Sequence, residues 1–384
     1  MKLRLGMIGG GQGAFIGAVH RHAAALDGLY ELVAGAFSSN PETSKASGQL
    51  LGLAADRVYG SYEELIAREK ALPETERVQV LSIVTPNHLH FAPAKLALEN
   101  GFHVILDKPM TFSLAEAKEL QAVAAASNGH FCLTHTYTGY PMVKEARQLV
   151  ASGELGTIRK AYVEYPQGWL SNFEEGSSDN KQAAWRTDPA RSGVAGAMGD
   201  IGTHAFNLLE YVTGLSVTQL CADINTVVPG RKLDDDGAVL LRLAGGASGV
   251  LVATQVAAGE ENNVRLRVYG DKGGLEWQQV DANTLQVKWL DRPTEIRRAG
   301  TGYVSSYARH NTRTPAGHPE GYLEAFANLY RNFALSLQAE LGGKSASAEA
   351  LDYPSIEEGV RGMAFIENVI ASGRSDQKWT EFTV

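Results

Sequence analysis

Near the start of the chain, the glycine-rich stretch Gly9-Gly-Gly-Gln-Gly-Ala-Phe-Ile-Gly17 follows the apolar segment Leu3–Ile8 and precedes a helical pattern that extends to about Leu26. The apolar segment is typical of a buried strand, and glycines let the backbone turn tightly from a strand into a helix. A strand, a tight turn and a helix form the first part of a βαβ unit. This stretch therefore predicts that the chain begins with an α/β domain.

Strands and helices continue to alternate as far as residue 138. Strand patterns occur at Leu29–Phe37, Val78–Val84, Phe102–Leu106 and His130–His135, with helical patterns between them that include Leu114–Ala126. Strands separated by helices of this length form parallel βαβ units. Residues 1–138 are therefore predicted to form a Rossmann dinucleotide-binding domain with a doubly wound parallel sheet.

The pattern changes after residue 138, where strand-like runs follow one another with few helices between them. These runs are Ser216–Asn225, Gly237–Leu243, Gly249–Val256, Asn263–Gly270, Leu275–Gln279 and Thr284–Leu290. Helical patterns occur at Pro141–Ser152, Gly202–Thr213, Gly321–Glu340 and Ser355–Ser372, and a long polar loop at Gly168–Asp188. Residues 139–384 are therefore predicted to form an α+β domain with a large, mostly antiparallel, open sheet of about six strands, which binds substrate and forms oligomers.

Length and composition agree with two soluble domains. A single core rarely exceeds roughly 300 residues, and the chain has 384. The 35 basic and 43 acidic residues give a net charge of −8, which argues against a nucleic-acid-binding surface. Two cysteines are too few for a disulfide framework and indicate a reducing compartment. We find neither the pattern of a signal peptide nor a membrane-spanning apolar run, so we expect a cytoplasmic protein.

The glycine-rich turn is suited to a pyrophosphate, because glycines allow the backbone to approach it and the helix N-terminus favours its charge. The G-x-G-x-x-G pattern is only partly matched: Gly9 and Gly11 fit, but Ala14 takes the third position, and Gly17 is expected to pack the helix against the turn. A purely structural turn is the alternative. We expect NAD or NADP to contact Gly9, Gly11, Gln12, Gly13, Ala14, Phe15 and Ile16.

The end of the second strand bears on the choice between NAD and NADP. A carboxylate at this position would bind the ribose 2′-hydroxyl of NAD, but the strand ends in Ser38, Ser39 and Asn40. These small polar side chains leave room for a 2′-phosphate, and Lys45 is the nearest cation. The sequence therefore favours NADP slightly.

Three further motifs occur in order along the chain. Thr85-Pro86-Asn87-His88-Leu-His90 follows one predicted strand, Asp107-Lys108-Pro109 follows the next, and Trp185-Arg186 precedes Gly196-Ala-Met-Gly-Asp200-Ile-Gly-Thr-His204. With the glycine-rich turn and Gly17-Ala-Val-His20, they resemble the Gfo/Idh/MocA family, named for glucose–fructose oxidoreductase, inositol 2-dehydrogenase and rhizopine catabolism. The sequence departs from the family pattern in three places: Asp107 replaces the usual glutamate, the turn is three residues longer, and the second strand lacks a carboxylate.

Lys108 and the pair of Asp200 and His204 are the predicted catalytic residues. Lys108 follows a parallel strand, where ligands of open α/β sheets bind, and an ammonium there can stabilise a developing alkoxide. Asp200 and His204 are four residues apart and share a helix face, so the carboxylate can orient the imidazole as a general base. The alternatives are a surface lysine before a proline, and a helix cap beside an ordinary histidine. The resemblance implies that the histidine accepts the proton and the aspartate contacts substrate.

The remaining predicted site residues come mainly from the resemblance. Cofactor contacts are expected from Thr85, Pro86, Asn87, His88, His90, Asp107, Lys108 and Pro109. Substrate contacts are expected from Tyr137, Trp185, Arg186, Asp200 and His204, and we add His318 because its segment joins polar and rigid residues. No third ligand stands at metal-binding spacing beside Asp200 and His204, so no catalytic metal is expected.

These observations predict an NAD(P)-dependent oxidoreductase that transfers a hydride between nicotinamide and a secondary alcohol or ketone of a sugar, sugar derivative or inositol-like polyol. Two alternatives remain: an NAD-dependent glycoside hydrolase that oxidises, eliminates and re-reduces, and a non-catalytic nicotinamide-binding sensor. The expected partner is a small sugar or polyol, with neither nucleic acid nor membrane. Family members cover the open sheet by forming dimers or tetramers, so a homodimer or homotetramer is expected.

Overall fold

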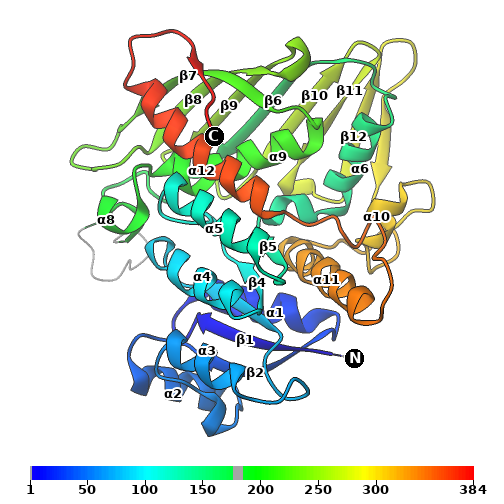
Figure 1. Cartoon of the computed structure of the whole chain (residues 1–384). Helices are drawn as coiled ribbons and strands as arrows, with labels where there is room; N and C mark the ends of the chain where they lie inside the picture. The colour runs from blue at the N-terminus through cyan, green and yellow to red at the C-terminus, as the bar shows by residue number, and fades with distance from the viewer. Residues whose placement is uncertain (1, 176–184) are drawn as a thin grey trace. The chain divides into compact units, whose positions relative to one another are not determined.

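The computed structural model of the chain describes residues 2–175 and 185–384 (Figure 1). The chain divides into two compact units, one comprising Met1–Gly139 and Tyr322–Val360, the other Tyr140–Gly321 and Arg361–Val384. All of 139–384 was predicted to belong to the second domain, whereas Tyr322–Val360 packs with the first unit. Part of the predicted polar loop, residues 176–184, lies outside the described residues.

The first unit contains the predicted parallel sheet. Its five strands have the order β2-β1-β3-β4-β5, and every neighbouring pair is parallel. The strands are β1 (Leu3–Gly9), β2 (Tyr30–Ala36), β3 (Val80–Val84), β4 (His103–Leu106) and β5 (Phe131–Leu133). The helices between them are α1 (Phe15–Leu26), α2 (Pro41–Leu50), α3 (Tyr62–Lys70), α4 (Phe91–Glu99) and α5 (Leu114–Ala126), with short turns η1 (Ala55–Arg57), η2 (Asn87–Leu89) and η3 (Thr136–Gly139). The predicted Rossmann fold is confirmed.

The strand order determines where a ligand can bind in this unit. The chain moves outward from β1 to β2 and then returns to the other side of β1 to form β3. At such a switch point the connections leave in opposite directions and open a crevice at the carboxyl ends of the strands. The glycine-rich turn after β1 and the Thr85–His90 segment after β3 both lie at this edge.

Helix α11 (Tyr322–Leu341) explains why a late segment belongs to the first unit. Its apolar side chains, including Phe326, Tyr330 and Phe333, are buried in one core with residues of α1, β1, β3, β4 and β5. The helix packs along α1 and against η3. Because this apolar face is covered by the parallel-sheet unit, Tyr322–Val360 folds with that unit, although it follows the second sheet in the sequence.

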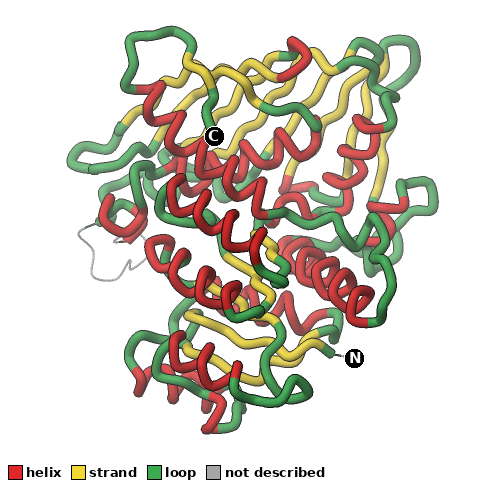
Figure 2. The backbone as a smooth tube through the Cα atoms, in the orientation of Figure 1, coloured by secondary structure: helices red, strands yellow, loops and turns green. Residues whose placement is uncertain are grey.

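The second unit is built on a nine-stranded sheet with the order β13-β12-β11-β10-β6-β9-β8-β7-β14. Figure 2 draws the strands in yellow. All neighbouring pairs are antiparallel except β6 and β9, which confirms the predicted mostly antiparallel open sheet. Its strands are β6 (Ile158–Pro166), β7 (Val217–Asn225), β8 (Asp236–Leu243), β9 (Ser248–Thr254), β10 (Arg265–Gly270), β11 (Gly273–Gln278), β12 (Thr284–Trp289), β13 (Glu295–Arg298) and β14 (Thr380–Glu381). The expected number of about six strands was too low, because β6, β13 and β14 were not predicted.

Helices α6 (Pro141–Ala151) and α9 (Thr203–Thr213) cover one face of this sheet. The unit also contains α8 (Pro189–Ser192), α10 (Ser306–His310) and most of α12 (Ile356–Gly373), with shorter turns η4 (Met198–Gly202), η5 (Ala244–Gly246) and η6 (Gln279–Asp281). Helix α9 packs on β6, β9 and β10, and α6 packs on β11 and β12. Along β8, Val239 and Leu241 are buried whereas Leu240 and Arg242 are exposed, so alternate residues face the helices.

No helix in residues 2–175 and 185–384 combines the length and the hydropathy needed to cross a membrane.

Candidate functional site

The turn after β1 is shaped by glycines that no other residue could replace without strain. Gly9, Gly10 and Gly13 have φ angles of 81°, 70° and 77°, a region that L side chains rarely adopt. A Cβ at Gly17 would lie 2.4 Å from the Cα of Gly10, so the first turns of α1 pack directly on the glycine turn. The expectation that Gly17 packs the helix against the turn is confirmed.

The N-terminus of α1 has no side-chain cap, so its backbone N–H groups can bind an anion. Its N-cap residue, Ala14, provides no side-chain hydrogen bond, whereas the N-caps of α2 and α5, Asn40 and Ser113, each accept one from a backbone N–H. The first N–H groups of a helix have no partners within the helix, and they favour negative charge. The uncapped N-terminus and the glycine cradle therefore fit the pyrophosphate of a dinucleotide.

The residues after β2 surround the position expected for the ribose of the adenosine half. The Ser38 hydroxyl accepts the N–H of Asn40 at 3.1 Å, and the Asn40 side chain caps α2 by accepting the N–H of Thr43 at 3.0 Å. Ser39 and Lys45 are exposed. The segment carries no carboxylate before Glu42, which lies in the first turn of α2. A hydroxyl-lined position with one lysine and one glutamate nearby allows either cofactor.

The predicted cofactor residues after β3 and β4 are connected by His90, a fully buried residue. Its Nδ1 lies 2.7 Å from the Pro109 carbonyl oxygen and its Nε2 lies 2.8 Å from that of Thr85. Burial lowers the pKa of His90, although both carbonyl groups and Asp107 oppose this shift. This imidazole thus joins the ends of two neighbouring strands. Nearby, His88 has a buried Nδ1 without a hydrogen-bond partner in the described residues, which suits a group that binds a ligand.

Asp107 anchors the segment that carries Lys108. One of its carboxylate oxygens, Oδ1, accepts the N–H of Lys108 at 2.9 Å and the hydroxyl of Thr134 at 3.0 Å. Burial alone would raise the pKa of Asp107, but the neighbouring His20, His90 and Lys108 lower it to about 2. The carboxylate therefore stays ionised at physiological pH, and its negative charge attracts the positive charge of Lys108. The Lys108–Pro109 peptide bond is cis.

Close to Lys108, the chain continues after β5 into His135 and Tyr137, which are both buried. Burial and the positive charge of Lys108 lower the pKa of His135 to about 3, so its imidazole is neutral at physiological pH. Tyr137, a predicted substrate contact, lies in η3.

In the second unit, Asp200 lies in a π-helical turn, Met198–Gly202, directly before α9. The carboxylate of Asp234 holds the start of this turn by accepting the N–H groups of Gly196 at 2.6 Å and Met198 at 2.8 Å. π turns are rare and often occur at functional sites. Asp200 lies in this turn and His204 lies in the first turn of α9, which continues it.

Asp200 receives contacts that the motifs in the sequence did not predict. The amide of Gln255 donates to Asp200 Oδ2 at 3.0 Å, and Arg186 Nε lies 3.5 Å from the same oxygen. The Arg186 guanidinium lies over the ring of Trp185, with 4.8 Å from Cζ to the ring centre. The structure thus brings together the predicted residues Trp185, Arg186 and Asp200, and adds Gln255.

A chain of polar side chains continues from Gln255. The Gln255 amide also approaches Gln167 Oε1 at 3.3 Å, and that oxygen accepts Trp169 Nε1 at 3.0 Å. The Gln167 amide donates in turn to Asn262 Oδ1, which also accepts the hydroxyl of Tyr165 at 2.8 Å. The Tyr165 ring centre lies 6.4 Å from that of His204, which is 8% exposed. Amide side chains of this kind donate and accept hydrogen bonds, as a polyhydroxylated ligand requires.

His318 occupies a different setting in the second unit. It is exposed on a turn in which its N–H donates to the Pro315 carbonyl and its own carbonyl accepts the Thr314 hydroxyl. The buried Glu320 organises this turn by accepting the N–H of Thr314 at 2.7 Å. The structure does not bring His318 together with Asp200 through any described contact.

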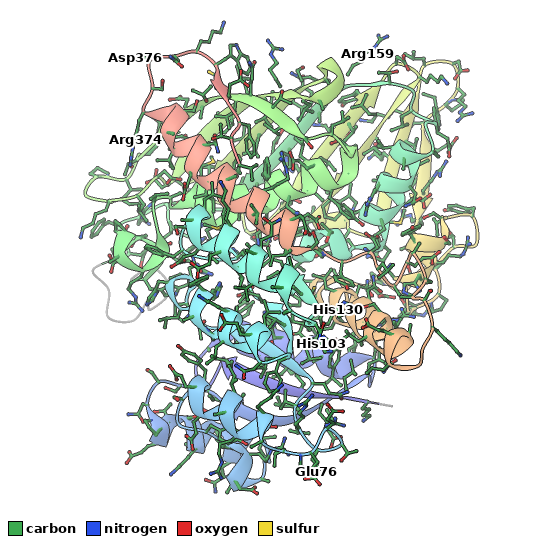
Figure 3. The ribbon with its side chains drawn as sticks, viewed as in Figure 1. Glu76, His103, His130, Arg159, Arg374 and Asp376 are labelled. Atoms are coloured by element: carbon green, nitrogen blue, oxygen red, sulfur yellow. The ribbon has the colours of Figure 1, made fainter. Side chains whose placement is uncertain are left out.

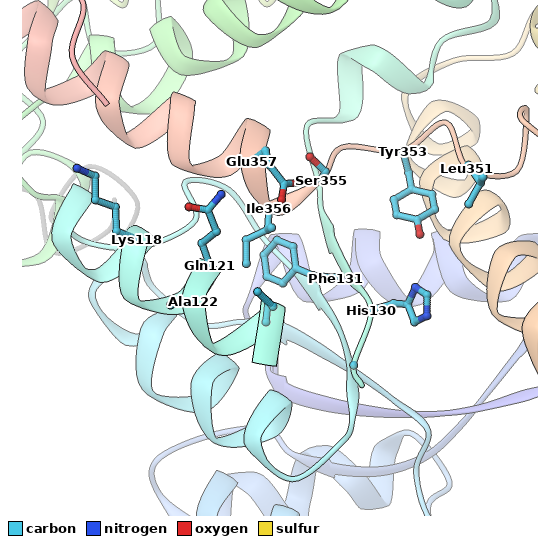
Figure 4. Close-up of a pocket in the computed structure, with 13 residues that line it drawn as sticks. Lys118, Gln121, Ala122, His130, Phe131, Leu351, Tyr353, Ser355, Ile356 and Glu357 are labelled. Carbon is cyan, nitrogen blue, oxygen red and sulfur yellow. The ribbon is translucent and has the colours of Figure 1, made fainter. Parts of the chain in front are cut away.

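Residues 2–175 and 185–384 contain no group of three or more His, Cys, Asp or Glu side chains arranged to hold a metal ion. An open hollow of about 600 Å³ in the first unit lies between α5, the start of β5 and the segment 351–357 (Figure 4). It includes His130 and Phe131 at the amino end of β5, whereas ligands of parallel sheets bind at the carboxyl ends. None of the predicted site residues lines this hollow.

Comparisons with known proteins agree with the two folds. Residues 3–135 match the oxidoreductase family with an NAD-binding Rossmann fold, and residues 143–276 match the GFO/IDH/MocA C-terminal domain. The chain is 32% identical to the uncharacterized oxidoreductase YfiI of Bacillus subtilis, over 99% of this chain and 97% of the relative.

Two solved structures are similar over almost their whole length. An oxidoreductase from Sinorhizobium meliloti is 44% identical, with a TM-score of 0.89 and 99% of each chain covered. An inositol dehydrogenase homolog from Azotobacter vinelandii, complexed with NADH and myo-inositol, is 33% identical, with a TM-score of 0.90 and coverage of 100% of this chain and 98% of that one. The chain therefore belongs to the Gfo/Idh/MocA family and is an NAD(P)-dependent dehydrogenase that acts on CH–OH groups.

Proposed function

We propose that this dehydrogenase oxidises a secondary alcohol of a cyclic polyol, a sugar or a sugar derivative, and reduces the corresponding ketone in the reverse direction. The observation that carries the proposal is the polar group around Asp200, in which Gln255 and Arg186 contact a carboxylate directly before α9, the helix that bears His204. A carboxylate among amides is suited to several adjacent hydroxyl groups. The inositol dehydrogenase homolog with bound myo-inositol supports the same class of substrate.

Each predicted residue has a defined task in this reaction. The nicotinamide, when bound, accepts the hydride from the alcohol carbon or returns it to the ketone. Lys108 donates a hydrogen bond to the reacting oxygen and stabilises the negative charge that develops there. His204 accepts the hydroxyl proton, and Asp200 binds a neighbouring hydroxyl and orients the substrate.

Substitutions at two positions test these tasks separately. Lys108→Met should abolish turnover but leave cofactor affinity nearly unchanged, because the side chain acts on the substrate oxygen. His204→Asn should lower the rate roughly 10²–10⁴-fold and remove the pH dependence of a general base. Near-normal turnover in the lysine variant, or an unchanged pH–rate profile in the histidine variant, would contradict the assigned role.

The lean toward NADP(H) remains a prediction. Ser38 and Ser39 leave room for a 2′-phosphate and Lys45 could neutralise it, whereas Glu42 in the first turn of α2 opposes it. Paired titrations with NADH and NADPH, followed by nicotinamide fluorescence, measure the preference directly. Tighter binding of NADH would overturn the lean toward NADP(H).

The glycoside hydrolase alternative uses the same oxidation as its first step. It differs in that the cofactor is restored in each cycle. A screen of glycosides would therefore release the aglycone without net reduction of the cofactor, whereas the proposed dehydrogenase accumulates reduced cofactor with free polyols or sugars.

We also propose that the enzyme forms a homo-oligomer through the sheet of the second unit. On the face away from α6 and α9, β8 exposes Leu240 and β9 carries the half-buried Val250 and Val252. Light scattering after size-exclusion chromatography should give two or four chains per particle, and Leu240→Lys should reduce that number. A monomeric parent protein would refute this proposal.

A further inference from the structure

The core of the first unit contains a group of polar side chains that the proposed function does not use. His20 on α1, Ser82 on β3 and Tyr330 on α11 are at most 1% exposed. The Tyr330 hydroxyl lies 2.7 Å from His20 Nδ1 and 2.7 Å from Ser82 Oγ, and Ser82 Oγ lies 3.3 Å from the same His20 nitrogen. Buried polar groups of this kind are costly unless each is satisfied, so the arrangement requires an explanation.

The other nitrogen of His20 faces Asp107. His20 Nε2 is buried, has no hydrogen-bond partner in residues 2–175 and 185–384, and lies 3.8 Å from Asp107 Oδ1. That distance is too long for a hydrogen bond, but it lies within the range of strong electrostatic interaction in a dry interior. Oδ1 is the same oxygen that accepts the N–H of Lys108 and the hydroxyl of Thr134.

The charge on Asp107 determines where the imidazole proton lies. If His20 Nδ1 carried the proton, the bare lone pair of Nε2 would face the carboxylate, and the two would repel each other. If Nε2 carries it, the N–H dipole points toward Oδ1, and Nδ1 accepts the hydroxyl proton of Tyr330. Ser82 then donates to the Tyr330 oxygen, so both hydroxyls and His20 Nδ1 are satisfied, while the Nε2 N–H is held toward Oδ1 by electrostatic attraction alone. Burial raises the pKa of Tyr330, which keeps its hydroxyl protonated as a donor.

We propose that His20, Ser82 and Tyr330 act as a positioning relay that holds the Asp107 carboxylate in place and, through its bond to the N–H of Lys108, sets the position of that lysine. The inference rests on the proposed function of Lys108 and names three further residues that serve it. These are positioning residues, because none of them needs to touch substrate or cofactor. The relay also gives α11 a role in the site, since the helix supplies Tyr330.

The relay has a consequence for pH dependence. His135 from the segment after β5 and Tyr330 from α11 interact electrostatically with Asp107. The groups that lower the pKa of Asp107 are His20 from α1, His90 from the segment after β3, and the adjacent Lys108. Together they lower the pKa of Asp107 to about 2 against the opposing effect of burial. If the Tyr330 hydroxyl is removed, His20 Nδ1 loses the donor that supports this tautomer, the N–H is held less firmly toward Oδ1, and burial has a greater effect on the pKa of Asp107. The pKa of Asp107 then rises, and the carboxylate that holds Lys108 begins to protonate within the assay range.

Tyr330→Phe tests the relay, because it removes one hydroxyl and keeps the ring that packs on Phe326. The chain provides a matched control in Tyr30→Phe: Tyr30 is also buried, and its hydroxyl donates to the main-chain carbonyl of Tyr330 at 2.8 Å without touching His20. Tyr330→Phe removes the contacts of one hydroxyl with His20 and Ser82, whereas Tyr30→Phe removes one buried hydrogen bond, so the two variants are compared by their pH dependence and not by the size of the stability loss. Tyr330→Phe should lower kcat roughly tenfold and shift the acidic limb of the pH–rate profile upward, with unchanged cofactor Kd. Ser82→Ala should shift the limb in the same direction by less.

Equal behaviour of Tyr330→Phe and Tyr30→Phe would overturn the proposal, because only a general loss of stability would then be at work. A readout that does not need catalysis separates this inference from the proposed function. The difference between two folded variants in the pH dependence of unfolding between about 2 and 4 reports the change in the ionisation of Asp107, because the other carboxylates are common to both, and it can be measured in the Lys108→Met background too. If Lys108→Met stays active, the proposed function fails, yet the difference in this dependence between Tyr330→Phe and Tyr30→Phe still tests the relay.

Discussion

Replacing Gly17 by alanine should weaken cofactor binding by displacing the glycine turn. The new Cβ would lie 2.4 Å from both the Cα and the carbonyl oxygen of Gly10. Contacts between nonbonded atoms need about 3.4 Å or more, so helix and turn must separate by about 1 Å. The turn cannot yield freely, because Arg21 Nη1 donates to the Gly10 carbonyl at 2.6 Å and the N–H of Gly11 donates to Phe37.

A displacement of this size exceeds the tolerance of hydrogen bonds to a phosphate, which span roughly 2.7–3.2 Å. Losing one such charge-assisted bond costs about 1.5–3 kcal/mol, which corresponds to an increase in Kd of roughly 10- to 100-fold. Overpacking should also lower the free energy of unfolding by about 1–3 kcal/mol. This sign is opposite to that of an ordinary helical Gly→Ala change, which stabilises by about 1 kcal/mol.

Nicotinamide fluorescence titration measures Kd, and urea denaturation measures stability. The matched control is Ala18→Gly in the same turn of α1, because Ala18 is only half-buried and its removal lowers helix propensity without pushing on the turn. The control should bind cofactor almost normally. If Gly17→Ala bound cofactor with parent affinity and unfolded at higher urea concentration, the inferred packing of helix on turn would be wrong.

Three further outcomes are expected. Gln255→Leu removes the amide that donates to Asp200 and should lower kcat/KM roughly 10- to 100-fold with unchanged cofactor Kd. The control Gln286→Leu, at a half-exposed position of β12, should have little effect on kcat/KM. Equal losses in the two variants would contradict the inference that Gln255 positions Asp200. His103 lies beside His130 (Figure 3), and burial and His130 lower the pKa of His103 to about 4. Below pH 6.5 the unfolded chain therefore binds more protons than the folded one, and the free energy of unfolding should fall by roughly 1–3 kcal/mol between pH 6.5 and 4. His103→Gln should flatten that dependence, and an unchanged curve would exclude His103 as its source. Asp234→Asn leaves one oxygen for two backbone N–H groups and should raise KM while lowering stability by about 1–3 kcal/mol, as measured by steady-state kinetics and urea denaturation; parent values would show that the π turn does not need this anchor.

The fold was predictable where local patterns are strong. The helix over Leu114–Ala126 was predicted with the bounds that the structure shows, since Ser113 caps it and its length fits a βαβ crossover. The central strand β6 was missed, although Ile158, Ala161, Val163 and Tyr165 are buried in near-alternating positions, because polar residues lie between them. Alternation of apolar and polar residues is typical of a half-buried strand, so this alternation was the signal in the sequence that could have identified β6.

The candidate site shows a similar division. Lys108, Asp200 and His204 stand in short motifs whose residue types, spacing and resemblance to the family predicted the roles that we propose for them. Gln255 could not be found in this way, because it reaches Asp200 across 55 positions of the sequence through the pairing of β9 with β6 and β8. The same holds for α11: its helical pattern was evident, but a pattern of apolar residues does not specify which sheet they will cover.

The placement of α11 affects how the protein is made. Residues 140–321 are synthesised between the end of η3 and the start of α11. At about 5–20 residues per second, a ribosome needs on the order of 10–40 seconds to make that segment. During this interval the parallel sheet has emerged, but the surface of α1 that later receives Phe326 and Phe333 is uncovered, and the imidazole of His20 has no tyrosine to accept from. The nascent first unit must therefore wait for the second sheet to be translated, and a chain cut after residue 139 would keep that apolar surface permanently exposed.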